Sequence, residues 1–183
     1  MLQATLVTSS DELEQIHQLN QLNIKHHVDE KTQVDEGFVS WLYPVSLLQQ
    51  MHELAPAVII KEGETVAGYA LTTLREAGAF HPDLRIMFKN LETVQYQGRP
   101  LSDHHFYCMG QICVAKAYRG KGLVGLLYQK HKEVYGRQYD FILTEIATRN
   151  IRSIKAHEKI GFRTIHTYRD HMDEWAVVIW DWL

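Results

Sequence analysis

The sequence is poor in long hydrophobic runs, and this excludes a protein that crosses a membrane as a helix. The longest apolar runs, residues 55–60 and 175–180, are far shorter than the roughly 20 residues that span a bilayer. Residues 1–10 also lack the basic stretch and apolar core of a secretory signal. We therefore expect no membrane partner and a cytoplasmic location.

Cysteine is scarce as well, with only Cys108 and Cys113 in 183 residues. The two lie five positions apart in a predicted strand, where an odd separation directs side chains to opposite faces. The pair is therefore predicted to form no disulfide. Burial in a strand also makes either thiol a poor candidate for covalent catalysis.

A surplus of positive charge is missing too. The chain has 19 basic and 22 acidic residues, a formal net charge of −3 and a pI of about 6.4. Sequence-independent binding to nucleic acid depends on a basic surplus, so nucleic acid is not an expected partner. Eleven histidines are present, but no Cys/His spacing typical of a metal site accompanies them. We expect no metal.

The sequence does contain strand and helix signals without a linker or repeat, which predicts one domain over residues 1–183. Ser9, Ser10 and Asp11 supply N-cap chemistry for a first helix, and Gly63 marks a hairpin turn. The polar segment 75–103 is longer than most connections. The predicted strands are 2–8, 57–61, 66–73, 106–114, 139–147, 162–167 and 175–182, and further helices are predicted at 38–51, 84–91, 123–135 and 150–160. This order predicts an α/β fold with a mixed sheet and helices packed on it.

A glycine loop joins the predicted strand 106–114 to the predicted helix 123–135. It contains Arg119-Gly120-Lys121-Gly122, so the first backbone N–H groups of the helix follow directly on glycines. Such N–H groups have no partner inside the helix and attract a phosphate. Glycine also allows a ligand to approach the backbone closely.

Two other phosphate-binding motifs fit this loop less well. Gly120-x-Gly122-x-x-Gly125 matches the dinucleotide-binding fingerprint, but residues 115–119 separate its glycines from the strand. Only 64 residues remain from position 120 onward, too few for the usual two-halved sheet. The P-loop pattern is absent.

A second motif follows the predicted strand 139–147. Asn150 can cap a helix, Ser153 and His157 share its face, and Gly161 ends it. With this motif beside the glycine loop, the sequence resembles the GCN5-related N-acetyltransferase (GNAT) superfamily. That family has Arg/Gln-x-x-Gly-x-Gly/Ala after a strand and, later, Asn-x-x-Ala/Ser-x-x-x-Tyr-x-Lys-x-Gly-Phe.

The resemblance implies a mixed, mostly antiparallel sheet with helices on both faces. Two central parallel strands, here 106–114 and 139–147, are expected to splay apart, with acetyl-CoA as cosubstrate in the wedge between them. Val124 departs from the usual Gly or Ala, which keeps the N–H but adds bulk. The implied cofactor-binding residues are Ile112, Cys113, Val114, Arg119, Gly120, Lys121, Gly122, Leu123, Val124, Asn150 and Ser153.

The resemblance also suggests two catalytic residues, Glu145 and His157. Segment 144–150 looks like a stretch of the ribosomal-protein N-terminal acetyltransferases whose glutamate is a general base. A desolvated carboxylate there has a raised pKa. His157 replaces the tyrosine that often protonates the departing thiolate, and imidazole titrates near neutrality. A surface glutamate, packing of His157, and His104 or His105 acting through water are the alternatives.

The expected function is direct transfer of an acetyl group to a primary amine, and a catalytically inactive acyl-CoA-binding module is the alternative. The acceptor stays open between a small amine, a peptide N-terminus and a lysine side chain. The oligomeric state stays open too, with a homodimer among the options. The segments that usually form the acceptor groove bring acidic residues, which suit a cationic amine: Asp29, Glu30, Asp35, Glu36, Asp83, Asp103, Asp170, Asp173 and Glu174.

Overall fold

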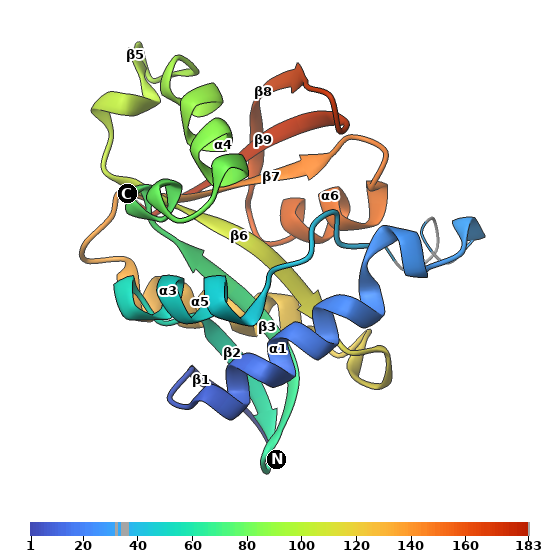
Figure 1. The fold of residues 1–183 in the computed structure, drawn as a ribbon. Coiled ribbons are helices and arrows are strands. Elements are labelled where there is room, and N and C mark those ends of the chain that lie inside the picture. The colour runs from blue at the N-terminus through green and yellow to red at the C-terminus, as the bar shows by residue number, and fades with distance from the viewer. Residues whose placement is uncertain (32, 34–36, 183) are drawn as a thin grey trace.

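The computed structural model describes residues 1–31, 33 and 37–182, and its centre is a seven-stranded sheet (Figure 1). The strand order is β1-β2-β3-β6-β7-β9-β8, and a separate two-stranded sheet joins β4 and β5. The strands are β1 Leu2–Leu6, β2 Val58–Glu62, β3 Thr65–Thr73, β4 Gln95–Tyr96, β5 Arg99–Pro100, β6 Phe106–Val114, β7 Phe141–Ala147, β8 Arg163–Arg169 and β9 Glu174–Asp181. The predicted seven main strands are thus confirmed within one to three residues at most ends.

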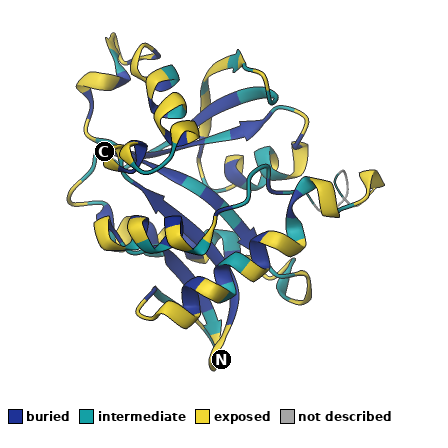
Figure 2. Cartoon of the chain, in the orientation of Figure 1, coloured by how far each residue is buried: buried dark blue, intermediate teal, exposed yellow. Residues whose placement is uncertain are grey.

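Helices cover both faces of this sheet. The α-helices are α1 Ser10–Asn23, α3 Val45–Leu54, α4 Pro82–Glu92, α5 Leu123–Tyr135 and α6 Ile151–Glu158, with 3₁₀ turns at Lys25–His27, Arg75–Ala79, Leu101–Asp103 and Lys116–Tyr118. Helices α1, α3 and α4 pack on one face of the sheet. Helix α5 packs on the other face, together with Phe162, which follows α6. The inner strands β3 and β7 and the middle of β9 are buried between these layers, whereas the edge strand β8 is largely exposed (Figure 2). No helix in the described part of the chain is long and apolar enough to cross a membrane.

The predicted helix at 38–51 is wrong in its first half. Helix α3 begins only at Val45, after Pro44 as its N-cap residue. Proline disfavours the helical conformation in the residue before it, so Tyr43 and the chain preceding it stay non-helical. The apolar residues at helical spacing in 38–43 therefore belong to a non-helical segment, which we call the 38–43 segment.

A β-bulge in β6 corrects the prediction for the two cysteines. Ala70 and Thr72 of β3 pair with Ile112 and Met109, so β6 has one extra residue between these pairs. The extra residue shifts the alternation of side chains along β6 by one position, so Cys108 and Cys113 point to the same face of the sheet. Cys108 packs among residues of α4 and Cys113 among residues of α1 and α3. Both are free and buried.

The two central strands splay apart as expected. Strands β6 and β7 are parallel and pair only at Phe106–Cys108 with Phe141–Leu143. Beyond these pairs the Thr144 hydroxyl donates to the Met109 carbonyl at 2.8 Å, and the strands then diverge (Figure 1). Strand β7 is antiparallel to its other neighbour, β9. This topology rules out the doubly wound parallel sheet of the dinucleotide-binding alternative.

His131 of α5 is buried and neutral within this core. Its Nε2–H donates to the Ala70 carbonyl at 3.2 Å, so Nδ1 accepts from the Tyr107 hydroxyl at 2.9 Å. A second proton, on Nδ1, would displace the Tyr107 O–H from this bond, and burial lowers the pKa of His131 to about 4. Protonation is therefore coupled to unfolding.

We expect the free energy of unfolding to fall on acidification because of His131. Its pKa lies near 6.5 in the unfolded chain and near 4 in the fold, so the cost starts below pH 6.5 and grows toward pH 4. Between pH 7.5 and pH 5 the loss is about 2 kcal/mol. In denaturant titrations at several pH values, the free energy of unfolding of His131→Gln should fall less steeply on acidification. The exposed variant His166→Gln should keep the pH dependence of the unmodified protein. Equal slopes in all three proteins would contradict the assignment.

Candidate active site

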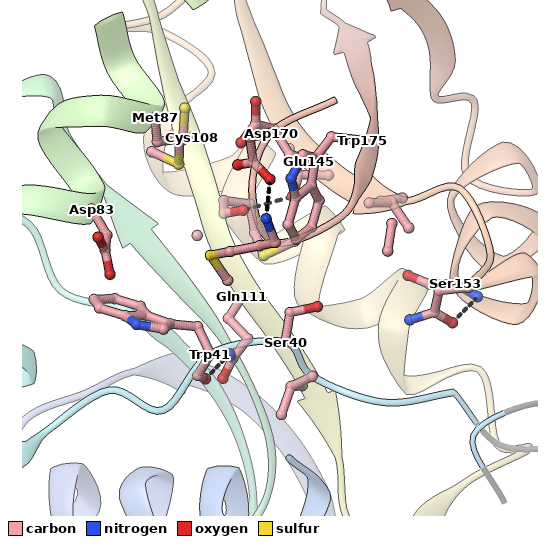
Figure 3. A pocket seen from close by; sticks show the side chains of 18 of the residues that line it. Ser40, Trp41, Asp83, Met87, Cys108, Gln111, Glu145, Ser153, Asp170 and Trp175 are labelled. Atoms are coloured by element: carbon pink, nitrogen blue, oxygen red, sulfur yellow. Dashed lines mark hydrogen bonds between the residues drawn. The ribbon is translucent and has the colours of Figure 1, made fainter. Parts of the chain in front are cut away.

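A cavity of about 160 Å³ opens where β6 and β7 diverge (Figure 3). Its walls come from the bulged part of β6, from the second half of β7 and from α6. The 38–43 segment, α4 and the turn between β8 and β9 line the rest of it. The splay of two strands thus creates a hollow that segments far apart in the sequence border.

Glu145 projects from β7 into this cavity. The hydroxyl of Tyr168 on β8 donates to Glu145 Oε1 at 2.7 Å. Burial raises the pKa of Glu145 to about 7, the nearby negative charge of Asp170 adds to this, and the bond from Tyr168 opposes it. The side chain is therefore placed and tuned to exchange a proton near neutral pH.

Two further carboxylates line the cavity. Asp170 follows β8, and its Oδ1 accepts the backbone N–H groups of Met172 at 2.8 Å and Asp173 at 3.0 Å. Partial burial alone would raise the pKa of Asp170, but hydrogen bonds lower it below its usual value. Asp83 lies in the first turn of α4. Figure 3 shows Asp170 beside Glu145 and Asp83 on the opposite side of the cavity.

The bulge of β6 anchors the 38–43 segment. The Gln111 amide donates to the Trp41 carbonyl at 2.7 Å, and the Tyr43 hydroxyl donates to the Gly110 carbonyl at 3.4 Å. Asn20 of α1 holds the same segment by donating to Trp41 O at 3.0 Å and accepting from Tyr43 N–H at 2.8 Å. The Trp41 ring is therefore fixed at the cavity wall.

His157 lies on the α6 wall, and protein groups occupy both of its ring nitrogens. Nδ1–H donates to the Ser153 carbonyl at 2.7 Å, so Nε2 accepts from the Tyr128 hydroxyl at 2.7 Å. Burial lowers the pKa of His157 to about 4. The imidazole is thus neutral at pH 7, and its one N–H is already donated to a backbone carbonyl. This geometry disfavours the expected acid role.

The glycine loop has the backbone that an anion site requires. Gly120 and Gly122 have φ angles of 76° and 74°, a region that favours glycine. A Cβ on either residue would meet nothing within 4 Å, so the surface there is open. Among the described residues, no protein acceptor receives the backbone N–H groups of 120–124. Helix α5 begins at Leu123 and directs its first N–H groups to this surface.

Several side chains predicted to bind the cofactor have other partners in the structure. Arg119 Nε donates to the Val114 carbonyl at 3.1 Å, and its guanidinium also donates to Asn23 of α1. The Lys121 ammonium lies 5.2 Å from the centre of the Tyr118 ring. Both cationic side chains thus contact protein groups, whereas the backbone N–H groups of the glycine loop remain available to a ligand.

Asn150 and Ser153 form the start of α6 at the cavity wall. Asn150 Oδ1 accepts the Ser153 N–H at 3.3 Å as an N-cap, and Asn150 Nδ2 donates to the Phe38 carbonyl at 3.0 Å. Ile112 also lines the cavity, whereas the Cys113 side chain lies in the core under α1 and α3. The side chain of Cys113 is therefore not available to a ligand here.

The alternative bases are not brought to the cavity. His104 is buried with Nε2 3.0 Å from the Tyr96 carbonyl, and His105 stacks on Tyr139 with ring centres 4.8 Å apart. Of the acidic residues expected near the acceptor, Asp83 and Asp170 line the cavity, and Asp35 and Glu36 lie outside the described residues. Within the described part of the chain, no cluster of three His, Cys, Asp or Glu residues could hold a metal ion.

Sequence reasoning missed Tyr168, Trp41 and the bulge at Gly110. Tyr168 lies in a strand whose sequence pattern is that of an exposed edge, and nothing in that pattern indicates its contact with Glu145. The helical spacing around Trp41 hid its place in a non-helical segment. Gly110 within a predicted strand was the one available signal, because an isolated strand glycine often marks a bulge.

A family model described as "Acetyltransferase (GNAT) family" matches residues 25–162. The ribosomal-protein-S18-alanine N-acetyltransferase from Escherichia coli is a structural neighbour at 13% identity and TM-score 0.64, covering 99% of this chain and 94% of that one. The NatC complex bound to Gag peptide and CoA matches at 12% identity and TM-score 0.67, covering 100% and 99%. The structure of yncA from Salmonella typhimurium with its cofactor acetyl-CoA matches at 14% identity and TM-score 0.62. The match covers 99% of this chain and 94% of that one. The search of curated proteins finds no match.

Proposed function

The chain belongs to the GNAT acetyltransferase family, and on that premise we propose that it transfers the acetyl group of acetyl-CoA to a primary amine in a ternary complex. One observation carries the proposal. Glu145, whose pKa is raised to about 7, lies in the cavity formed by the splay of β6 and β7. A proton acceptor at this position fits amine chemistry rather than binding alone.

The residues present fit acetyl-CoA. The open surface over Gly120 and Gly122 and the unused N–H groups at the start of α5 suit its pyrophosphate. Beyond Cys108 the edge of β6 no longer pairs with β7, so the backbone groups of Ile112 and Val114 that face β7 are available to the pantetheine, whereas the Cys113 backbone pairs with Tyr69 of β3. Acetyl-CoA thus serves as the cosubstrate, with its thioester directed toward the cavity.

In this reaction the nitrogen of the amine attacks the acetyl carbonyl carbon. The new C–N bond forms, the C–S bond breaks, and the sulfur leaves with the electron pair. An alkylamine has a pKa of about 10.4 and must first lose a proton. Glu145 takes that proton directly or through water, and Tyr168 holds its carboxylate in place. The nitrogen loses a second proton as the amide forms, and this proton passes through water to the departing thiolate, which leaves as free CoA thiol.

The test is an acetyl-transfer assay that follows free thiol release from acetyl-CoA with and without amines. Amine-dependent thiol release, with the acetylated amine identified by mass, supports the transferase. Tight binding of CoA without transfer to any amine supports the alternative, an acyl-CoA-binding module without catalysis.

The role of His157 is tested by replacing it with tyrosine and with phenylalanine. Because both ring nitrogens are bonded within the protein, we expect both variants to keep kcat within about tenfold of the unmodified protein. We expect His157→Phe to lose roughly 1–3 kcal/mol of unfolding free energy, because the buried Tyr128 hydroxyl loses its acceptor. Activity retained in His157→Tyr but abolished in His157→Phe would instead assign an acid role to residue 157.

A further inference from the structure

The acceptor side of the cavity is rich in carboxylates. Asp83, Glu145 and Asp170 line it, and no Lys or Arg is among its lining residues in the described part of the chain. His171 also lines it, and its interaction with the neighbouring Asp170 favours the anionic form of that carboxyl. His157 also lines the cavity and is neutral at pH 7, because burial lowers its pKa to about 4. The cavity therefore attracts a cation and repels a carboxylate.

Asp170 is built to remain an anion at this position. Its Oδ1 accepts the backbone N–H groups of Met172 and Asp173, which fix the carboxylate in the turn between β8 and β9. Glu145 lies close enough for the charge of Asp170 to act on it. Two neighbouring carboxylates in different surroundings can divide their work, one staying charged and the other exchanging a proton.

Apolar side chains form much of the remaining wall. Trp41 and Met87 lie on the side of Asp83, and Trp175 lies on the side of Asp170 (Figure 3). Met172, whose N–H donates to Asp170, also lines the cavity. The Trp41 ring packs edge-on against the rings of Tyr43 and His81, with ring centres 4.3 Å and 4.7 Å away. These contacts hold the Trp41 ring in place. An alkyl or aromatic group attached to the bound amine would therefore be buried here.

Resting on the function proposed above, we propose that the acceptor is a cationic primary amine with an apolar group and without a carboxylate beside the nitrogen, and that Asp170 is the residue that selects it. The ammonium lies between Asp170 and Glu145, and the apolar group contacts Trp41 and Met87. A free α-amino acid would place its carboxylate against Asp170 or Asp83. An alkylamine and the N-terminus of a peptide share the required chemistry.

The experiment compares ligands that differ only beside the nitrogen: isopentylamine, leucinamide and leucine, with the tripeptide amide Leu-Gly-Gly-NH₂ as the peptide arm. Binding to the protein saturated with CoA is measured by calorimetry, and acetyl transfer from acetyl-CoA is measured separately. Both are repeated with Asp170→Asn, which keeps the oxygen that accepts the turn N–H groups. Asp11→Asn, at an exposed position of α1 outside the cavity, is the matched control.

We expect leucinamide to be preferred over leucine by about 100-fold in kcat/KM, because leucine adds an unpaired charge to an acidic site. In Asp170→Asn we expect leucinamide to bind at least about tenfold more weakly and the preference over leucine to shrink by a similar factor. Asp11→Asn should behave as the unmodified protein. Acetylation of the tripeptide amide identifies a peptide N-terminus as the source, and acetylation of isopentylamine alone identifies a small amine.

The outcomes separate this inference from the proposed function. Acetylation of leucine as efficient as that of leucinamide would overturn the inference and leave the acetyltransferase intact. Asp170-dependent binding of leucinamide without any acetyl transfer would overturn the proposed function and support the ligand class. Leucinamide binding that Asp170→Asn leaves unchanged would remove Asp170 from the acceptor site.

Discussion

Replacing Glu145 with glutamine is expected to lower kcat by about 10²–10⁴ while leaving the affinity for acetyl-CoA nearly unchanged. Glutamine keeps the shape of the side chain and an oxygen that can accept from Tyr168, so the bond at 2.7 Å has a replacement. Only the basicity is lost. Steady-state kinetics together with a binding titration of acetyl-CoA measure the two quantities separately.

The pH dependence of the reaction gives a second signature of Glu145. A base must be deprotonated to act, so kcat/KM should rise with pH through an inflection near the Glu145 pKa of about 7. The inflection should vanish in Glu145→Gln. Exposed Glu133→Gln on α5, which forms an ion pair with Lys130, is the matched control and should keep it. An unaltered profile with full turnover in Glu145→Gln would show that another group or a water chain takes the proton.

Replacing Gly122 with aspartate is expected to weaken acetyl-CoA binding by about 100-fold or more. Gly122 is the N-cap residue of α5, where the amides of the glycine loop face outward. A carboxylate about 4 Å from a phosphate costs several kcal/mol at the effective dielectric of a protein surface, and salt reduces part of this. The loss should therefore shrink as the ionic strength is raised.

Gly122→Asn separates charge from backbone strain in this test. Gly122 has a φ of 74°, and asparagine and aspartate both tolerate this region better than other side chains do. The two variants therefore have closely similar volume and strain but differ in charge. We expect Gly122→Asn to bind acetyl-CoA several-fold more weakly than the unmodified protein and Gly122→Asp far more weakly still. Equal affinities in the two folded variants would place the pyrophosphate elsewhere.

The local features of the site were predictable from the sequence. The cap chemistry of Ser9 and Asn150, the hairpin turn at Gly63 and the glycines before α5 depend on short-range rules for φ and for unpaired N–H groups. These rules act between residues a few positions apart, so the sequence displays them. The same signals located most strands to within a few residues and led to the family.

Contacts between distant segments were not predictable in this way. The bulge in β6 depends on its register with β3, and it brought Cys108 and Cys113 to one face against the expectation from their spacing. His157 fills the position of a tyrosine in the motif, yet Tyr128 on another helix occupies its nitrogen. A sequence pattern contains no information about the partner that will meet a side chain across the core.

The chemistry of Glu145 combines both kinds of information. Its place five residues before Asn150 suggested a base from the sequence alone. Burial and the charge of Asp170 raise its pKa and the hydrogen bond from Tyr168 opposes them, and these groups come together only when β8 folds back beside β9. The sequence thus determined which group could carry the proton. The tertiary structure decided the pKa of that group, because desolvation and neighbouring charge are properties of the space around a side chain.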